Sequence, residues 1–310
     1  MLNTFNFLTL INNIPEDHIP KKINLVLEGG CMNGAYEIGG LTFIKQLEKK
    51  NKIRVKKISG ASVGAYAGFL YLTDNLDHFV NDYEDLKSSF KKKLKLVKLK
   101  KQITFLVNKL SDNEFKSLQN NKLFITFYNV NKRQQEVISK YVNKKHLIKS
   151  ILKSCHIPFL INGECFYYDD DEPYIDGGTP YLFSINKKSK SVKNLYMKIT
   201  RYDKISTVLN ISYEKTIHGR ILEGILDTYN FFLKSKQTKM CSFVEDWNII
   251  NSVHYNICKT SFHILIILIY LFDFFTKPFL LSFKKTHFYK HFSPAFFKIY
   301  ESTILYFVFM

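Results

Sequence analysis

The 310-residue sequence contains five cysteines, an odd number, and no two of them form a C-x-x-C pair. This usage argues against a disulfide framework and against a zinc site, and it suits a reducing compartment. The amino terminus has a short apolar patch, but it lacks a basic n-region and a small-residue cleavage site. We therefore expect an intracellular protein that is not secreted.

Arginine is also scarce, because Arg54, Arg133, Arg201 and Arg220 are the four arginines among 45 basic residues. The formal net charge of +18 is large enough to attract nucleic acid or anionic lipid. Base readout and bidentate phosphate recognition favour the planar fork of arginine, so the lysine excess argues against specific nucleic-acid binding. Part of that excess is equally consistent with an A/T-rich genome.

Glycine is rare too, with 13 residues, and its distribution is uneven. Eight glycines fall between Gly29 and Gly68, and two more form the pair Gly177-Gly178. Glycine is needed where the backbone turns sharply or approaches a ligand closely. The clustering therefore indicates a site built from these segments.

Two strand-helix units follow an expected leader over residues 1–20. Residues 23–27 (INLVL) and 53–58 (IRVKKI) have the apolar, β-branched character of strands, and glycines and a helical pattern come after each. Two such units with short connections predict a parallel sheet and an α/β fold. Further strands are expected over 122–130 and 191–200 and within 166–178, and helices over 74–118, from about 143, and over 216–239.

The first glycine cluster reads LEGGCMNGAYEIGG. A glycine turn between a strand and a helix leaves amides free to stabilise an anion. A Walker A loop would need Lys and Ser or Thr after Gly34, where Ala35 and Tyr36 stand, and a dinucleotide fingerprint would need glycine at Cys31. We therefore expect an oxyanion hole, and the candidates are Gly29, Gly30, Cys31, Met32, Asn33 and Gly34.

The second cluster, Gly60-Ala61-Ser62-Val63-Gly64, matches the G-x-S-x-G nucleophile elbow between a strand and a helix. A serine nucleophile needs a base. Asp176 follows an expected strand and precedes two glycines, and a Ser62–Asp176–His218 triad would fit the usual order of a hydrolase. His218, however, lies in TIHGRIL, which reads as the first turns of a helix and favours a surface or helix-start role.

Taken in order, these motifs resemble those of the patatin-like phospholipases. An acidic residue with a glycine loop (Glu28 to Gly34), G-x-S-x-G (Gly60 to Gly64) and D-G-G (Asp176, Gly177 and Gly178) appear in the order of that family. The segments GAYEIGGL and SCHIPFL also resemble family segments. The resemblance covers residues 23–181 well and extends loosely to 239.

The resemblance implies a three-layer α/β/α fold with a mainly parallel central sheet, in a domain over residues 21–240. It also implies a lipid acyl hydrolase of phospholipase A or lysophospholipase type, with a Ser62–Asp176 dyad, an acyl-serine intermediate and no metal or cofactor. The family usually has glycine where this chain has Cys31, and Arg or Lys where it has Asn33. These departures leave two alternatives open: a catalytically weak protein that binds lipid or remodels membranes, and an esterase or transacylase that uses His218.

Residues 241–310 form an expected apolar, aromatic-rich tail that associates with membranes. Nine apolar residues run uninterrupted over 264–272, and Asp273 follows them. The stretch reaches a spanning length of about 20 residues if Asp273 is tolerated, so it fits one span, an interfacial helix or a buried terminal helix pair. Residues 87–101 hold eight lysines between apolar residues, which suits an anionic membrane surface as well as a solvated charge run.

Overall fold

The computed structural model describes residues 6–93, 96–119, 121–159, 161, 164–184, 192–200 and 217–284. The side chains of residues 90–93, 97 and 276–284 are not described. The expectations for residues 1–5 and for the tail beyond residue 284 lie outside these ranges. In the lysine-rich segment of residues 87–101, residues 94 and 95 also lie outside these ranges.

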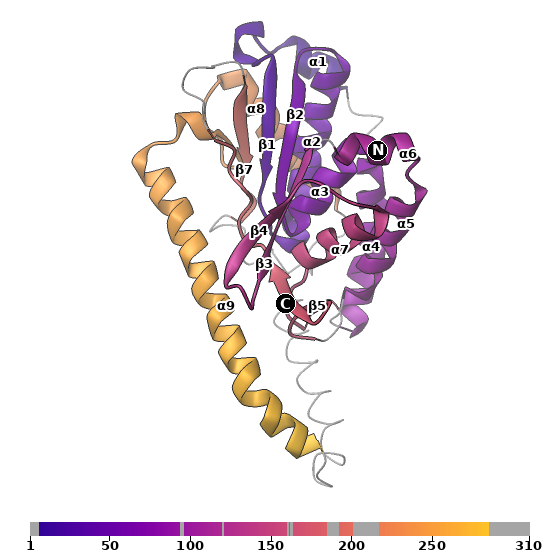
Figure 1. Ribbon diagram of the computed structural model, residues 1–310. Helices are drawn as coiled ribbons and strands as arrows, with labels where there is room; N and C mark the ends of the chain where they lie inside the picture. Colours follow the sequence, from indigo (N-terminus) through magenta and orange to yellow (C-terminus); the bar gives the residue numbers. More distant parts are fainter. Residues whose placement is uncertain are drawn as a thin grey trace.

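A central sheet organises the chain (Figure 1). In the described part it has eight strands in the order β5-β6-β3-β2-β1-β7-β8, with β4 also paired to β3. The strands are β1 (Lys22–Leu27), β2 (Arg54–Ala61), β3 (Leu123–Asn129), β4 (Gln134–Ile138), β5 (Tyr167–Asp169), β6 (Glu172–Asp176), β7 (Lys193–Met197) and β8 (Cys241–Phe243). The pairs among the four central strands are parallel, and those at both edges are antiparallel. The predicted α/β fold with a mainly parallel sheet is confirmed.

Helices flank this sheet (Figure 1). They are α1 (Phe7–Asn12), α2 (Gly34–Lys49), α3 (Val63–Leu72), α4 (Leu76–Lys93), α5 (Val97–Lys109), α6 (Asp112–Gln119), α7 (Lys144–Ser154), α8 (His218–Lys234) and α9 (Ile249–Lys284). In α2 the apolar residues spaced by three, from Ile38 to Leu47, are fully buried against the core. The lysine-rich segment of residues 87–101 is helical on both sides of residues 94–96.

The expected leader packs onto the domain. Phe7 and Ile11 of α1, together with Ile14 and Ile19, belong to the main hydrophobic core. At the other end of the domain, β8 pairs with β7, so residues 241–243 of the expected tail lie in the sheet. The long apolar helix α9 begins at Ile249.

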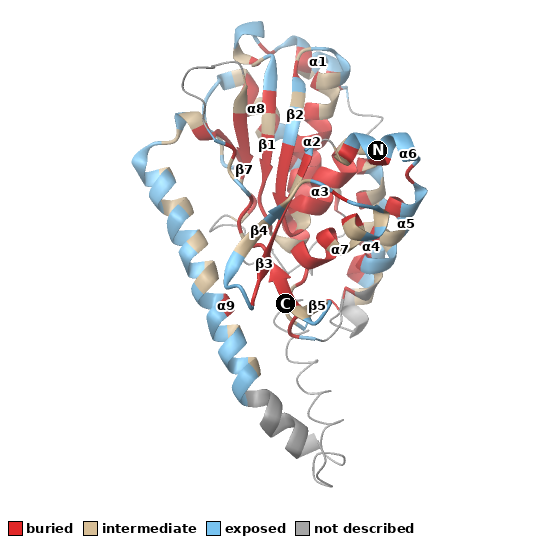
Figure 2. Cartoon of the chain, viewed as in Figure 1, coloured by how far each residue is buried: buried red, intermediate tan, exposed pale blue. Residues whose placement is uncertain are grey.

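Helix α9 is largely exposed, whereas the central strands and α3 are mostly buried (Figure 2). Within Ile249–Phe275, the most apolar window of 18 residues has a mean hydropathy of 1.7, and 6% of that window is buried. Among the described residues it is the one helix that is long and apolar enough to cross a membrane. One narrow face holds it to the domain, since Ile266 is buried beside Tyr128 and Ile175, and the Tyr255 hydroxyl donates to the Pro180 carbonyl at 2.8 Å.

Candidate active site

Ser62 stands at the turn between β2 and α3, and its backbone is unusual. Its φ of 55° and ψ of −131° lie in a region that costs a non-glycine residue on the order of 1–3 kcal/mol. Both flanking glycines are required there. A Cβ on Gly60 would come within 2.4 Å of the Gly64 carbonyl, and a Cβ on Gly64 within 2.5 Å of the Leu27 carbonyl. The turn therefore has the geometry of a nucleophile elbow.

Asp176 ends β6, and the sheet brings it to Ser62. Strand β3 is the link, because it pairs in parallel with β2 and in antiparallel with β6, where Phe127 is opposite Asp176. The Ser62 side chain comes close enough to the Asp176 carboxylate to lower its pKa, and the Gly178 amide donates to Asp176 Oδ1 at 2.7 Å. The structure thus brings together two residues that are 114 positions apart in the chain.

Burial raises the pKa of the Asp176 carboxyl from an ordinary value of 3.8 to about 6, against the hydrogen bonds from Ser62 and Gly178 that lower it. Burial removes water from the ionised carboxylate, which disfavours ionisation and raises the pKa, and the interactions with Ser62 and Gly178 compensate for only part of this loss. A base with a pKa near neutrality accepts a proton more readily than an ordinary aspartate and is still ionised at pH 7.

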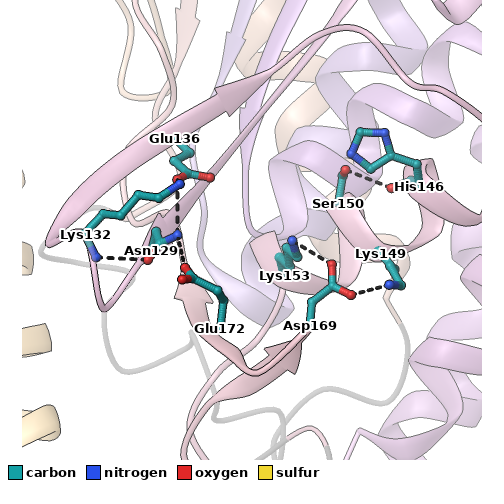
Figure 3. A network of polar contacts seen from close by, with 9 residues as sticks. All are labelled: Asn129, Lys132, Glu136, His146, Lys149, Ser150, Lys153, Asp169 and Glu172. Carbon is teal, nitrogen blue, oxygen red and sulfur yellow. Dashed lines mark hydrogen bonds and ion pairs between the residues drawn. The ribbon is translucent and has the colours of Figure 1, made fainter.

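Ion pairs on the β5-β6 hairpin hold the strand that carries Asp176 (Figure 3). Asp169 pairs with Lys149 and, at 2.9 Å, with the buried Lys153. Burial alone would raise the pKa of Asp169, but hydrogen bonds from both lysines hold it below its usual value. In the acidic run over residues 169–172, Asp170 and Asp171 are exposed to solvent, whereas Asp169 is held in ion pairs. At the start of β6, Glu172 accepts a hydrogen bond from Asn129 at 2.9 Å.

The first glycine loop lies directly beside Ser62. A Cβ on Gly29 would be 2.8 Å from the Ser62 Cβ, so the bare backbone of Gly29 touches the serine. The amides of Asn33 and Gly34 already donate to carbonyls of Gly30, Cys31 and Met32 inside the loop. Among the candidates over residues 29–34, the amides of residues 33 and 34 are therefore already engaged within the loop.

Cys31 and Asn33, the two departures from the family pattern, each have a distinct backbone conformation and environment in the loop. Cys31 adopts a φ of 47°, the left-handed conformation that favours glycine, and burial raises the pKa of its thiol to about 12. Asn33 is fully buried and has an ordinary φ of −68°. Its side chain donates to the Ile199 carbonyl and accepts from the Arg220 guanidinium, each at 3.0 Å.

Sequence reasoning did not identify Arg220 as a partner of the loop. Arg220 lies in α8, is buried, and sits over the ring of Tyr36 at 5.5 Å. The one available signal was that arginine is rare in this chain. A buried positive charge thus reaches Asn33 from another helix.

Glu28 fastens the opposite end of the loop. Its carboxylate accepts hydrogen bonds from the backbone of Ile199 and Thr200, both at 2.8 Å, and from the Tyr196 hydroxyl at 3.1 Å. Burial raises its pKa in spite of these bonds.

His218 is the first residue of α8. Within the described residues, the carboxylate of Asp176 interacts with Ser62 and Gly178, and no contact joins it to His218. The structure therefore does not assemble the Ser62–Asp176–His218 triad. The described residues also contain no group of three or more His, Cys, Asp or Glu side chains that would hold a metal ion.

An apolar cavity opens beside Ser62, with an empty volume of about 490 Å³. It is lined by side chains of the glycine loop, α3, α4, α5 and the segment after α7, namely Cys31, Met32, Ser62, Val63, Tyr66, Phe79, Tyr83, Leu86, Leu96, Leu99, Cys155, Ile157 and Ile161. Leu96 and Leu99 come from the lysine-rich segment. These two leucines thus face the site and give the cavity a wall suited to hydrocarbon.

Comparisons with known proteins give the family of the chain. The model of the patatin-like phospholipase family matches residues 25–183, just over half of the chain, and the protein belongs to this family of lipid acyl hydrolases. Among solved structures, VipD from Legionella pneumophila matches with 12% sequence identity and a TM-score of 0.38, over 70% of this chain and 67% of that chain. No curated protein matches the sequence.

Proposed function

We propose that the protein hydrolyses acyl esters of phospholipids or lysophospholipids through an acyl-serine at Ser62. The observation that carries this proposal is the approach of Ser62, on its strained turn, to the buried Asp176 carboxylate, whose pKa the Ser62 side chain lowers. Asp176 would take the hydroxyl proton as Ser62 attacks the ester carbonyl, and would return it to the leaving alcohol. Water, activated by the same carboxylate, would then release the fatty acid.

The developing oxyanion would be stabilised by the amides of residues 29–32. Gly29 lies against Ser62, and the loop leads into the amino terminus of α2, whose partial positive charge favours an anion. Each well-placed donor of this kind contributes roughly 3 kcal/mol to lowering the barrier.

The apolar cavity supports a lipid acyl chain as the group transferred. It begins at Ser62 and is lined almost entirely by hydrocarbon and aromatic side chains. Burial of each methylene of a substrate chain in such a cavity contributes about 0.8 kcal/mol. A short, water-soluble ester gains little of this energy, so we expect long-chain esters to be the better substrates.

Release of fatty acid from mixed liposomes, followed by mass spectrometry, tests this function. Ser62→Ala and Asp176→Asn should each abolish release, and His218→Ala should leave it close to wild type. If His218→Ala removes the activity as well, a triad replaces the dyad.

We further propose that the protein acts at an anionic membrane surface, with α9 as its anchor. Ile264 and Leu268 are 53% and 57% exposed on α9, four residues apart. Leu222 and Leu226 have the same spacing on α8, with exposures of 41% and 40%, and provide a matched control. In co-sedimentation with anionic vesicles, Ile264→Asp/Leu268→Asp should weaken binding at least about tenfold, whereas Leu222→Asp/Leu226→Asp should not. If both double substitutions weakened vesicle binding equally, α9 would not be the membrane anchor.

The positive φ of Cys31 supports a second candidate function, a catalytically weak protein that binds lipid or remodels membranes. The strained position would hold the loop amides away from the oxyanion. Cys31→Gly separates the two functions, because it should leave a working hydrolase active and should restore activity to a protein disabled at this position. A folded wild-type protein that binds vesicles without releasing fatty acid, together with a Cys31→Gly variant that does release it, would establish the second function.

A further inference from the structure

The end of helix α7 lies between Ser62 and Asp176 and contacts both. Three consecutive residues, Ser154, Cys155 and His156, are nearly or completely buried. The Ser154 hydroxyl accepts a hydrogen bond from the Ser62 amide at 2.9 Å, and the Cys155 thiol donates to the Ser62 carbonyl at 3.1 Å. The His156 carbonyl accepts from the Asp176 amide at 3.0 Å.

The Ser154 hydroxyl uses both its donor and its acceptor capacity. While it accepts from the Ser62 amide, it donates to the Thr126 carbonyl on β3 at 2.7 Å. A single hydroxyl thus joins the strained turn to a central strand of the sheet. An apolar side chain at this position would leave a buried N–H and a buried C=O without these bonds.

The backbone at Ser62 is strained, and the contacts from α7 hold it in that strained conformation. A backbone with φ of 55° and ψ of −131° persists when its surroundings over-determine it. Ser154 and Cys155 bind the amide and the carbonyl of that same residue, and they come from one rigid helix end. If they were lost, the turn would be free to relax and to carry the Ser62 hydroxyl away from Asp176.

We propose that Ser154, assisted by Cys155, is a positioning residue for the nucleophile. It holds the Ser62 backbone in the strained conformation that presents the hydroxyl to Asp176, while the His156 carbonyl fixes Asp176 from the same segment. This inference rests on the proposed function, because it assigns a task to Ser154 in a reaction at Ser62. Ser154 acts through the backbone and contributes no proton transfer of its own.

Ser150 offers a matched control one turn earlier on α7. It is equally buried, and its hydroxyl donates to the His146 carbonyl within the helix at 2.8 Å (Figure 3). Ser154→Ala and Ser150→Ala both remove a buried serine hydroxyl from the same helix. They differ in the link to Ser62.

The test measures fatty-acid release from liposomes as a function of substrate and pH. Ser154→Ala should lower kcat by about 10- to 100-fold, the range expected when a reacting group is misplaced, with KM nearly unchanged. It should also move the pH midpoint of kcat/KM upward, because the hydrogen bond from Ser62 that lowers the pKa of Asp176 would be weakened. Ser150→Ala should change neither quantity, and Ser154→Thr, which restores a hydroxyl, should recover part of kcat.

Cys155 provides an independent test if Ser154→Ala does not fold. Cys155→Ser keeps a donor for the Ser62 carbonyl and should retain most of kcat, whereas Cys155→Ala should lose more. An active wild type in which Ser154→Ala matches Ser150→Ala, or loses kcat with an unmoved pH midpoint, refutes the inference alone. A folded wild type without esterase activity refutes the proposed function, and the inference with it.

Discussion

Replacing Asp176 by asparagine should abolish activity and, at neutral pH, stabilise the fold. The reason is the cost of burying a charge. Burial raises the pKa of Asp176 from 3.8 to about 6, and about 1.4 kcal/mol per pH unit makes this about 3 kcal/mol against the ionised form in the folded state. Asparagine has nearly the same shape and carries no charge.

The sign and the pH window follow from proton binding. Between pH 3.8 and about 6 the folded protein keeps the Asp176 proton while the unfolded chain has lost it, so wild-type stability falls as pH rises through this window. Asp176→Asn removes the cost of the buried charge, but about 1 kcal/mol of that stabilisation is lost because an amide forms weaker hydrogen bonds than a carboxylate. The advantage of Asp176→Asn should therefore grow from near zero at pH 4.5 to about 2 kcal/mol at pH 8.

Urea unfolding of both proteins in non-ionic detergent, at pH 4.5 and pH 8, measures this difference. The chain has one tryptophan, Trp247, which packs against Tyr196 and Tyr255 and reports on the fold by its fluorescence. Other titrating groups are common to the two proteins, so their contributions cancel in the comparison. A variant whose relative stability is the same at both pH values, or falls with rising pH, would show that Asp176 does not carry a buried charge.

Three further predictions test the site and its support. The value of kcat/KM should rise about tenfold per pH unit below pH 6 and level off above it. The reason is that Asp176, with a pKa of about 6, must be ionised to accept a proton. A flat profile of kcat/KM from pH 5 to 7 would contradict the role of Asp176 as the base. Gly29→Ala would place a Cβ 2.8 Å from the Ser62 Cβ and should lower kcat at least about 100-fold, whereas Gly219→Ala, with no atom within 4 Å of the added Cβ, serves as a neutral control in the same assay. Lys153→Met should lower the free energy of unfolding by about 1–3 kcal/mol at pH 7. This loss should exceed that of Lys149→Met, because Lys153 is 9% exposed and Lys149 is 28% exposed. The loss should shrink as the pH falls through the lowered pKa of Asp169, and an equal loss at all pH values would exclude the ion pair as its cause.

Much of the fold followed from local patterns in the sequence. The βα units around β1 and β2 could be predicted because a β-branched run, a glycine turn and a periodic helix occur together at each. The meeting of Ser62 and Asp176 could be anticipated because both follow strands in a family pattern. Strands β4 and β8 were missed, since β4 is half-polar and β8 has three residues, too few to show a period.

Contacts between distant segments could not be predicted from the sequence. The bond between Arg220 and Asn33 joins residues 187 positions apart, and nothing local to either residue indicates the other. The role of Ser154 is similar, because its hydroxyl could equally have bonded within α7, as that of Ser150 does. Charge runs were ambiguous for another reason: Asp169 and Asp170 are neighbours, yet one is paired and the other exposed.

The most direct measurement of the central claim is covalent labelling with a fluorophosphonate probe, followed by peptide mass spectrometry. The account predicts a single adduct on Ser62 in the wild type, none in Ser62→Ala, and a much slower reaction in Asp176→Asn. It also predicts that a long-chain ester bound in the apolar cavity beside Ser62 protects against labelling. A well-folded protein that reacts at another residue, or labels Ser62 at the same rate without the Asp176 carboxylate, would contradict the account.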